Sequence, residues 1–169
     1  MVKEKTIKVY EFEDLNDKAK EKVLDSFRNS DYPEYMYSLE EIILSLKAIS
    51  KKFNFNLDYS LGYDRGTYVS VKNDFKGTTR EFFKGYYTKN EAKEHTKGIC
   101  PFTGMCYDCT FFDVMVEEWE QDFQDFLKEV GNRYLKLSFD EIEYHSSDSA
   151  IIEMVEANEY EFDENGKRI

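Results

Sequence analysis

The spacing of the apolar residues changes near residue 54, and this change limits the possible folds more than any other feature. Over 38–53, apolar side chains recur at steps of three and four, which is the spacing of one helix face. They alternate with polar residues over 55–61 and again over 67–71, with a glycine-containing turn between the two runs. Ser38 and Glu41 match the capping box that starts many helices. The pattern therefore predicts a helix over 38–53 followed by a β-hairpin.

The N-terminal segment carries a strand pattern and then a helix pattern. Apolar and polar residues alternate over 6–10, which is typical of a strand. Asn16 and the acidic Asp17 then precede apolar residues at helical spacing. A helix over 17–29 is expected, with Asn16 as its cap.

The middle of the chain has a less regular pattern. Residues 79–87 carry several aromatic side chains, whose spacing fits both a third strand and a short helix. Residues 88–109 contain Gly98, Pro101 and Gly104 and show little periodicity, which favours a long ordered loop. A loop of this length usually has a functional or structural reason.

Helical spacing returns in the last third of the chain. Over 110–130, apolar residues form one stripe and acidic residues mainly occupy the other faces. Gly131 and Asn132 are expected to stop or kink this helix. The pattern over 134–144 fits both a strand and a helix, and we favour the helix. Ser147 is a suitable cap for a short helix that follows.

Together these patterns predict an α+β fold in which a small antiparallel sheet packs with about four to five helices. A last strand is expected at 160–162, before an Asn-Gly turn at 165–166. No internal repeat, low-complexity tract or flexible linker divides the sequence, so residues 1–169 are expected to form a single domain.

Charge is distributed unevenly along the 169 residues, whose formal net charge is −12. Residues 1–110 are charge-balanced, with 18 acidic and 18 basic side chains, whereas residues 111–169 hold 17 acidic and 5 basic ones. The whole net charge thus belongs to the acidic, mainly helical part at 111–169. Such a chain is repelled by nucleic-acid phosphates and anionic lipids and is attracted to basic surfaces.

The same sequence predicts a cytoplasmic protein without a membrane partner. Its longest weakly charged stretch, 98–116, is interrupted by Asp108 and Asp113, and the first residues lack the apolar run of a signal peptide. The 3 cysteines are an odd number within one short segment, unlike the disulfide framework of a secreted domain.

A structural zinc site is one interpretation of the segment that carries the cysteines. Soft thiolates and an imidazole are typical ligands of tetrahedral zinc, and the spacing of Cys106 and Cys109 matches a zinc knuckle. With His95 and Cys100 they would make four ligands, and the metal would order the long loop. Three free thiols on an irregular loop are the alternative, since a second Cys-x-x-Cys arm is missing.

Enzymatic interpretations have less support in the residues present. His95 near the cysteines invites a Cys–His dyad, but the sequence has no cysteine-protease signature and no nucleophile elbow. Its glycines match no phosphate-binding loop. Carboxylates are so abundant that many pairs fit a magnesium-dependent nuclease, whereas few basic residues over 111–169 would face a phosphate. No catalytic residue is predicted.

The acidic surface of the C-terminal part is the main candidate site. Its carboxylates lie on the helix expected over 110–130 and on the segment 140–164, and they would present fixed negative charge that competes for a basic groove on a partner. Tyr134 and Tyr144 are expected to be exposed and to anchor such a contact. A solvated, solubilising helix face is the ordinary alternative for such a charge run. The predicted partner-binding residues are Asp113, Glu117, Glu118, Glu120, Asp122, Asp125 and Glu129.

Three segments resemble small acidic accessory proteins that phages and mobile elements of Gram-positive bacteria encode. The first is 8–23, where a Phe-x-x-Leu end of a strand leads into a helix that begins Asn-Asp-x-Ala-Lys. The second is 100–108, with Cys-Pro-Phe-Thr-Gly followed by Cys-Tyr-Asp. The third is 150–162, with Ile-Glu-x-x-Glu-Ala-Asn-Glu-Tyr-Glu-Phe. These motifs consist of caps, turns and core residues, so they indicate relatives rather than an activity.

This resemblance implies a role in the conflict between phage and host, inside the bacterial cell. Accessory proteins of this kind include type II anti-CRISPR proteins, which block Cas9, and some are labelled antitoxins. We therefore expect a non-enzymatic inhibitor that binds Cas9 or its guide complex through the acidic surface and blocks its engagement of nucleic acid. The alternatives are a metal-dependent nuclease acting on guide RNA, and an antitoxin-like protein that binds another host protein.

Overall fold

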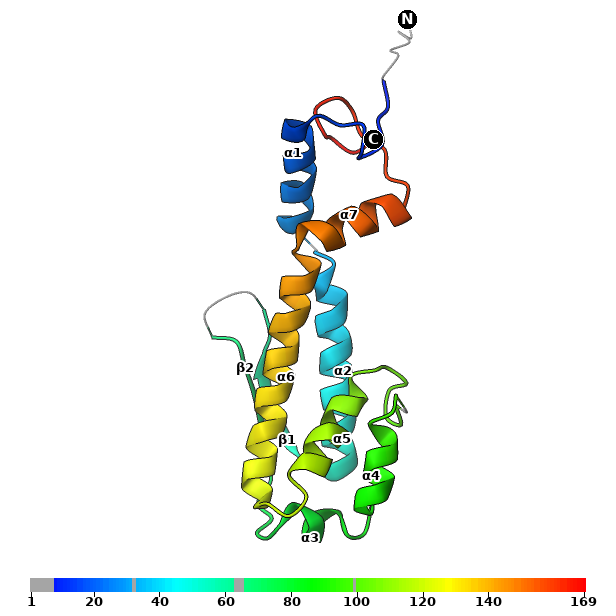
Figure 1. Cartoon of the computed structure of the whole chain (residues 1–169). Coiled ribbons are helices and arrows are strands. Elements are labelled where there is room, and N and C mark those ends of the chain that lie inside the picture. The colour runs from blue at the N-terminus through cyan, green and yellow to red at the C-terminus, as the bar shows by residue number, and fades with distance from the viewer. Residues whose placement is uncertain (1–7, 32, 63–65, 99) are drawn as a thin grey trace, which may run out of the picture. The chain divides into compact units, whose positions relative to one another are not determined.

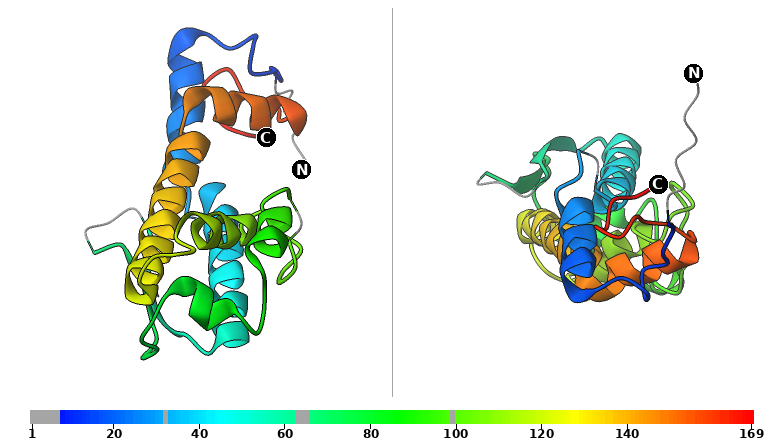
Figure 2. Two further views of the ribbon diagram at one scale, coloured as in Figure 1. Left: turned by 60° about the horizontal axis from the view of Figure 1, so that its bottom comes forward. Right: turned by 90° about the horizontal axis from the view of Figure 1, so that it is seen from above.

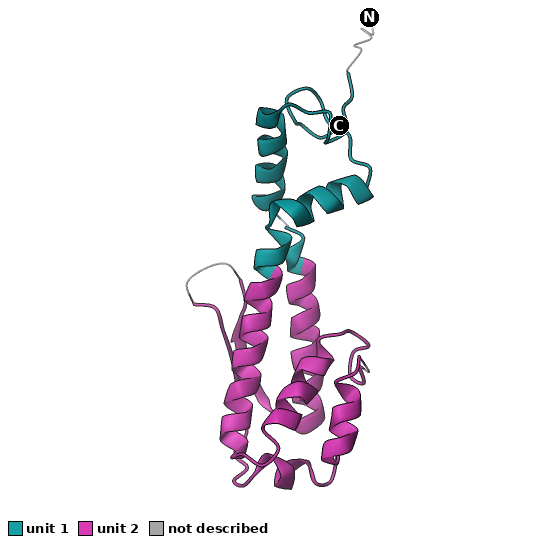
Figure 3. Cartoon of the chain, in the orientation of Figure 1, with its two compact units in different colours: residues 1–36, 142–169 teal, residues 37–141 magenta. Residues whose placement is uncertain are grey.

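The computed structural model describes residues 8–31, 33–62, 66–98 and 100–169. Within these ranges it contains seven helices and one two-stranded antiparallel sheet, which confirms the α+β class with a small sheet (Figure 1). The chain forms two compact units, which Figure 3 colours separately. Unit 1 comprises residues 1–36 and 142–169, and unit 2 comprises residues 37–141. The single domain over the whole chain stays a prediction.

Two capped helices carry the core of unit 1. Helix α1 spans Asp17–Arg28, and the Asn16 side chain accepts a hydrogen bond from the backbone N–H of Ala19 at 3.0 Å. Helix α7 spans Asp148–Ala157 and has Ser147 as its cap. Both predicted caps are confirmed. The apolar faces of the two helices meet in a core whose buried members are Phe12, Leu15, Ala19, Val23, Ile151, Val155 and Phe162.

The two ends of the chain pair in unit 1 by a single bridge. Tyr10 and Phe162 exchange backbone hydrogen bonds of 2.9 Å in each direction. The strand predicted at 160–162 is therefore wrong, because within the described residues this segment forms only isolated bridges at Phe162, one to Tyr10 and one to Arg168. Of the strand predicted at 6–10, residues 6 and 7 lie outside the described residues, and 8–10 form no regular strand.

The predicted turn at 165–166 is present in unit 1. It returns the chain so that Arg168 pairs with Phe162. Gly166 has a φ of +79°, and a Cβ atom there would lie 2.5 Å from the carbonyl oxygen of Ala19. Both the left-handed backbone and this close approach to α1 require glycine.

Unit 2 begins with the predicted helix and hairpin. Helix α2 spans Tyr35–Phe53, and strands β1, Asn56–Ser60, and β2, Tyr68–Lys72, pair antiparallel from Asn56 opposite Lys72 to Ser60 opposite Tyr68. The turn between the strands includes residues 63–65, which lie outside the described residues. The helix and hairpin are confirmed.

The capping box predicted at Ser38 and Glu41 is wrong, because α2 begins earlier in the chain. Its first turn starts at Tyr35, and the N–H of Met36 donates to the carbonyl oxygen of Pro33 at 2.9 Å. Ser38 therefore lies inside the helix. A proline just before a helix favours this start, since its missing N–H needs no partner there.

Two real capping boxes lie further along the chain. Helix α3 spans Thr79–Phe83 and is capped by Thr78 together with Glu81. Helix α4 spans Lys89–His95 and is capped by Thr88 together with Glu91. The structure thus selects the helix for the first part of 79–87, and the long loop predicted over 88–109 is wrong where α4 forms.

The helix predicted over 110–130 is two helices, α5 over Asp108–Glu117 and α6 over Phe123–His145. Backbone carbonyl groups between the two helices accept hydrogen bonds from the start of α3. Because these carbonyls are used there, the helix does not continue through them. The N–H groups of Thr79 and Arg80 donate to the carbonyl oxygens of Gln121 and Trp119, at 3.0 and 2.9 Å.

The stop or kink predicted at Gly131 and Asn132 is wrong, because α6 continues through both residues. Glycine is needed at position 131 for another reason, the close approach of a strand. A Cβ atom at Gly131 would lie 2.7 Å from the carbonyl oxygen of Val69, so glycine lets β2 approach α6 closely. The helix favoured over 134–144 is confirmed as the second half of α6.

Helices α2, α5 and α6 lie next to one another in unit 2 (Figure 2). Aromatic side chains fill the core of this unit. The ring of Phe111 lies 5.4 Å from that of Phe53 and 5.7 Å from that of Phe126, measured between centroids. Phe83 of α3 contacts the same cluster edge-on, at 5.1 Å from Phe53. Each fully buried ring removes a large apolar surface from water, so this cluster fixes the helices around the loop that carries the cysteines.

Candidate functional site

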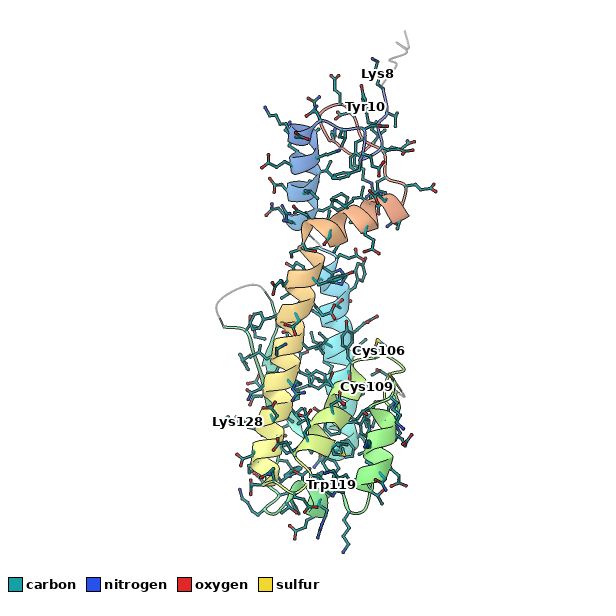
Figure 4. The ribbon with its side chains drawn as sticks, viewed as in Figure 1. Lys8, Tyr10, Cys106, Cys109, Trp119 and Lys128 are labelled. Atoms are coloured by element: carbon teal, nitrogen blue, oxygen red, sulfur yellow. The ribbon has the colours of Figure 1, made fainter. Side chains whose placement is uncertain are left out.

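The seven carboxylates predicted to bind a partner lie on two helices and on the segment that joins them. Asp113 and Glu117 belong to α5, whereas Asp125 and Glu129 belong to α6. Glu118, Glu120 and Asp122 lie in the connection, which Figure 4 marks by its label on Trp119. The seven residues therefore do not share one helix surface.

Three of these seven carboxylates have a cationic partner. The Arg133 guanidinium lies 2.7 Å from the Glu117 carboxylate and 3.3 Å from that of Glu129. Arg80, from the charge-balanced part of the sequence, lies 3.4 Å from Glu120. These pairs neutralise charge that the sequence alone suggested was available to a partner.

Two of the remaining four carboxylates are held by the fold, one by a hydrogen bond and one by partial burial. Asp122 accepts a hydrogen bond from the backbone N–H of Gln124 at 2.8 Å, at the start of α6. Asp113 is half-buried, and burial, followed by the nearby Glu117, raises the pKa of its carboxyl. Glu118 and Asp125 make no ion pair with any residue that the structure describes.

The two tyrosines expected to anchor a contact differ in exposure. Tyr134 is 0% exposed, and its hydroxyl donates to the carbonyl oxygen of Tyr107 at 2.7 Å. The prediction that Tyr134 is exposed is therefore wrong, and burial raises the pKa of this phenol. Tyr144 is 56% exposed, as expected.

The units divide the charge differently from the sequence. Unit 1 holds 17 acidic and 9 basic side chains, or −8, whereas unit 2 holds 18 acidic and 14 basic ones, or −4. Residues 1–36 join the acidic C-terminal segment in unit 1. Most of the net charge therefore belongs to the smaller unit.

An acidic pocket of about 620 Å³ opens in unit 1. Five glutamates contribute to its wall, and none of them forms a salt bridge within the described ranges of the chain. Phe12 and Val155 line it and are buried, whereas the Tyr160 ring is half-buried. The lining residues, called here the acidic pocket, are Glu11, Phe12, Glu13, Val155, Glu156, Glu159, Tyr160 and Glu161.

The two aromatic side chains of the acidic pocket already contact cations of their own chain. The Arg168 guanidinium lies 3.5 Å from the ring centroid of Tyr160, and the Lys20 ammonium lies 5.8 Å from that of Phe12. Phe27 stacks on Tyr160 with an interplanar angle of 2° and holds this ring in place. Rings in this arrangement attract cations through their electron-rich faces.

Glu159 reaches the rim of the acidic pocket from an unusual backbone conformation. It follows α7 with a φ of +51°, a left-handed conformation for which helix ends commonly use glycine. The turn is closed by the N–H of Tyr160, which donates to the carbonyl oxygen of Val155 at 3.1 Å. The sequence shows this only as Asn-Glu where Asn-Gly is the usual helix-stop signal.

The cysteine segment brings two sulfurs into contact. The Sγ atoms of Cys100 and Cys109 are 3.8 Å apart, and both residues are half-buried, whereas Cys106 is exposed. Burial and the neighbouring Cys109 thiol raise the pKa of Cys100 to about 11. Within the described ranges, no three His, Cys, Asp or Glu side chains converge as a ready metal cage.

A buried carboxylate organises the loop around these thiols. Asp108 is 0% exposed and accepts hydrogen bonds from the backbone N–H groups of Phe102 and Thr103, both at 2.8 Å. It also accepts from the hydroxyls of Thr103 at 3.0 Å and of Ser45 in α2 at 2.5 Å. These four bonds supply the loop order that the sequence argument assigned to a metal.

Comparison with known proteins finds no matching family model, no matching curated protein and no matching solved structure. Among the described helices, none combines the length and the apolar character needed to cross a membrane. The acidic pocket was not predicted, because Glu11 and Glu13 lie far in sequence from the other three glutamates.

Proposed function

We propose that the protein is a non-enzymatic binding protein that contacts a basic partner through the acidic pocket of unit 1. The observation that carries this proposal is the set of five glutamates around one open pocket, none with a salt bridge among the described residues. On the resemblance described above, Cas9 or its guide complex is the partner to test first. Binding there would block a basic groove that otherwise holds nucleic acid.

Unpaired carboxylates are suited to such a contact for an electrostatic reason. A carboxylate that already faces an arginine loses that partner before it binds another cation, whereas an unpaired one does not. Several like charges around a concave surface also add their fields, which speeds the approach of a basic partner. Among the residues that the structure describes, the acidic pocket has both properties, and the Arg133-paired residues Glu117 and Glu129 do not.

The apolar part of the acidic pocket supports the same function. Lysine and arginine side chains carry long aliphatic stems as well as a charge. The half-buried Tyr160 ring provides apolar surface for such a stem, beside the glutamates that would face its cationic end. This combination favours protein side chains over simple metal ions, which would need converging oxygens alone.

A charge-reversal comparison tests the proposal. Glu156→Lys with Glu161→Lys changes the pocket, and Glu118→Lys with Asp125→Lys makes the same charge change on unit 2. We expect the first pair to weaken binding to Cas9, or to an arginine-rich model peptide, by at least about tenfold, mostly through the association rate. The second pair should change affinity by less than about threefold.

Glu159→Gly distinguishes the effect of lost charge on binding from an effect of lost stability. Glycine suits a φ of +51° better than glutamate does, so stability should be kept or raised while one pocket charge disappears. Binding that weakens in this stable variant supports the pocket. Equal effects of the two charge-reversal pairs, or no effect of either, would contradict it.

A Cas9 cleavage assay identifies the step that is blocked. The protein is added before or after guide loading, and a gel of the guide follows each reaction. Inhibition with an intact guide supports a binding inhibitor. A shortened guide would instead support the nuclease, and a lack of inhibition despite peptide binding would point to a different basic partner.

A further inference from the structure

Two thiols of unit 2 lie close enough to react with each other, and the proposed function does not use them. The Sγ atoms of Cys100 and Cys109 are 3.8 Å apart, and both residues are half-buried. We propose that this pair is a modification site, at which a small-molecule disulfide such as oxidised glutathione converts the two thiols into a reversible Cys100–Cys109 disulfide. The inference goes beyond the proposed function, which concerns unit 1.

The distance between the two sulfurs favours bond formation after small side-chain movements. A disulfide bond is about 2.05 Å long, so the sulfurs have to approach each other by about 1.8 Å. Each sulfur moves when its side chain rotates about the Cα–Cβ bond, and this rotation leaves the backbone in place. The reduced pair therefore already faces the partner with which each thiol would react.

The fold holds both cysteines of the pair in position. Cys109 lies in the first turn of α5. On the other side, the carbonyl oxygen of Cys100 accepts a hydrogen bond from the N–H of Gly104 at 3.1 Å. The nearby Phe102 stacks on Phe112 of α5, with ring centroids 5.5 Å apart and an interplanar angle of 8°. Its N–H also donates to the buried Asp108 carboxylate, so the segment that carries Cys100 is fixed on α5.

The third cysteine differs from the pair and provides an internal comparison. Cys106 is exposed, and Figure 4 labels it together with Cys109. In the part of the chain that the structure describes, the sulfur-to-sulfur contact is the one between Cys100 and Cys109. Cys106 is therefore expected to stay a free thiol when the pair is oxidised.

The reaction consists of two thiol–disulfide exchanges. A thiolate of the pair attacks one sulfur of oxidised glutathione, the S–S bond of the reagent breaks, and one glutathione leaves. The second protein thiolate then attacks the mixed disulfide, so that the Cys100–Cys109 bond forms and the other glutathione leaves. The two protons lost by the protein thiols balance those taken up by the two glutathione thiolates. The protein pair is oxidised, and the glutathione disulfide is reduced.

Incubation of the reduced full-length chain with oxidised glutathione at mildly alkaline pH tests the site. We expect the intact mass to fall by about 2 Da, with a single thiol left for alkylation after unfolding. Cleavage after Met105 and after Tyr107 separates the three cysteines, so the fragments that remain joined identify the bond. Dithiothreitol should restore all three thiols.

Three serine variants compare the three possible pairs, since each variant leaves a different one. Cys106→Ser keeps the proposed pair, whereas Cys100→Ser and Cys109→Ser each keep Cys106 with one member of it. The equilibrium constant for disulfide formation against glutathione should be at least about tenfold larger in Cys106→Ser than in the other two variants. Because this preference comes from the fold, it should disappear in concentrated urea.

Far-UV circular dichroism shows whether each variant is folded. The proposal would be overturned if the folded wild-type chain joined Cys106 to another cysteine, or if it kept glutathione adducts without an internal bond. It would equally be overturned by equal constants for the three folded variants, or by a preference for the Cys100–Cys109 bond that is unchanged in urea.

Discussion

The two candidate acidic surfaces, one in each unit, differ in how far their carboxylates are paired with cations. Unit 2 has 14 basic side chains for 18 acidic ones, and arginines reach three of the seven carboxylates that the sequence marked as a site. Unit 1 has 9 basic side chains for 17 acidic ones, and its acidic pocket gathers five glutamates without a salt bridge in the described chain. The availability of charge is therefore decided by pairing, which a count along the sequence does not show.

The cores of the two units also differ, in size and in aromatic content. The buried core of unit 1 has seven members, two of them phenylalanines, whereas unit 2 contains a network of stacked and edge-on rings. A small core leaves less stabilisation to offset the mutual repulsion of unpaired carboxylates. Unit 1 should accordingly be the more sensitive of the two to mutation, to low salt and to further negative charge.

The largest expected effect is the loss of unit 1 in Gly166→Ala. The new Cβ would meet the Ala19 carbonyl oxygen 2.5 Å away, at a φ of +79°. We expect a loss of about 2–4 kcal/mol from strain and crowding together. Hydrogen exchange followed by mass spectrometry should show faster exchange in α1 and α7 than in α3–α5.

Gly104→Ala is the control for the cost of a positive φ in alanine, without the steric contact. Gly104 also has a positive φ, +78°, but a Cβ there would meet no atom within 4 Å. It should cost only about 1 kcal/mol, measured by urea unfolding. Equal losses in the two variants would show that contact with α1 does not matter.

A smaller effect is expected from Gly131→Ala in unit 2. Its Cβ would lie 2.7 Å from the Val69 carbonyl oxygen, although alanine also favours the helix. We expect a net loss of about 1–2 kcal/mol, with faster exchange in β1 and β2. Gly85→Ala, where nothing lies within 4 Å, should leave stability unchanged. A stable Gly131→Ala variant would contradict the close packing of β2 on α6.

Loss of a helix cap should depend on pH in unit 2 but not in unit 1. Thr88→Ala in unit 2 and Ser147→Ala in unit 1 should each cost about 1 kcal/mol at neutral pH. Thr88 pairs with Glu91, whose pKa is lowered by hydrogen bonds from the Thr88 backbone and side chain. Ser147 has no such acidic partner, since the corresponding position is Ala150.

The sign of the pH effect follows from this lowered pKa. Stabilisation by Glu91 is complete above the ordinary glutamate pKa and is lost as pH falls through the lowered one. The cost of Thr88→Ala should therefore shrink on acidification below about pH 4.5, whereas the cost of Ser147→Ala should not. Urea unfolding at neutral and acidic pH measures both. Parallel pH profiles would contradict the capping-box assignment.

The smallest expected effect comes from making unit 2 resemble unit 1. Arg133→Gln removes the partner of Glu117 and Glu129. Stability should fall by about 1 kcal/mol or less, because exposed ion pairs contribute little. Affinity for an arginine-rich peptide should rise slightly, and more so at low salt, since two carboxylates become available. Unchanged affinity at low salt would show that pairing does not limit the surface of unit 2.

Local signals in the sequence predicted the parts of the fold that depend on neighbouring residues. The caps at Asn16 and Ser147, the hairpin and the helical face of α2 all follow from spacing within a few residues. Capping boxes show the limit of this approach. The one predicted at Ser38 does not form, whereas those at Thr78 and Thr88 do.

The remaining features depend on contacts between distant residues. The break between α5 and α6 is made by backbone hydrogen bonds from Thr79 and Arg80, about 40 residues earlier. The acidic pocket needs Glu11 and Glu13 to meet the end of α7. Neither contact has a signal in local spacing, so composition located the excess charge but could not locate the exposed site.

The hydrogen bond between Asp108 and Ser45 spans 63 residues, and this separation has a consequence for the order of assembly. An ionised carboxylate is costly to bury without its donors, so the thiol loop gains its full order only after α2 and α5 have met. The rate at which Cys100 and Cys109 can be alkylated should therefore fall as refolding proceeds. Pulsed alkylation during refolding would record the moment at which the interior of unit 2 closes.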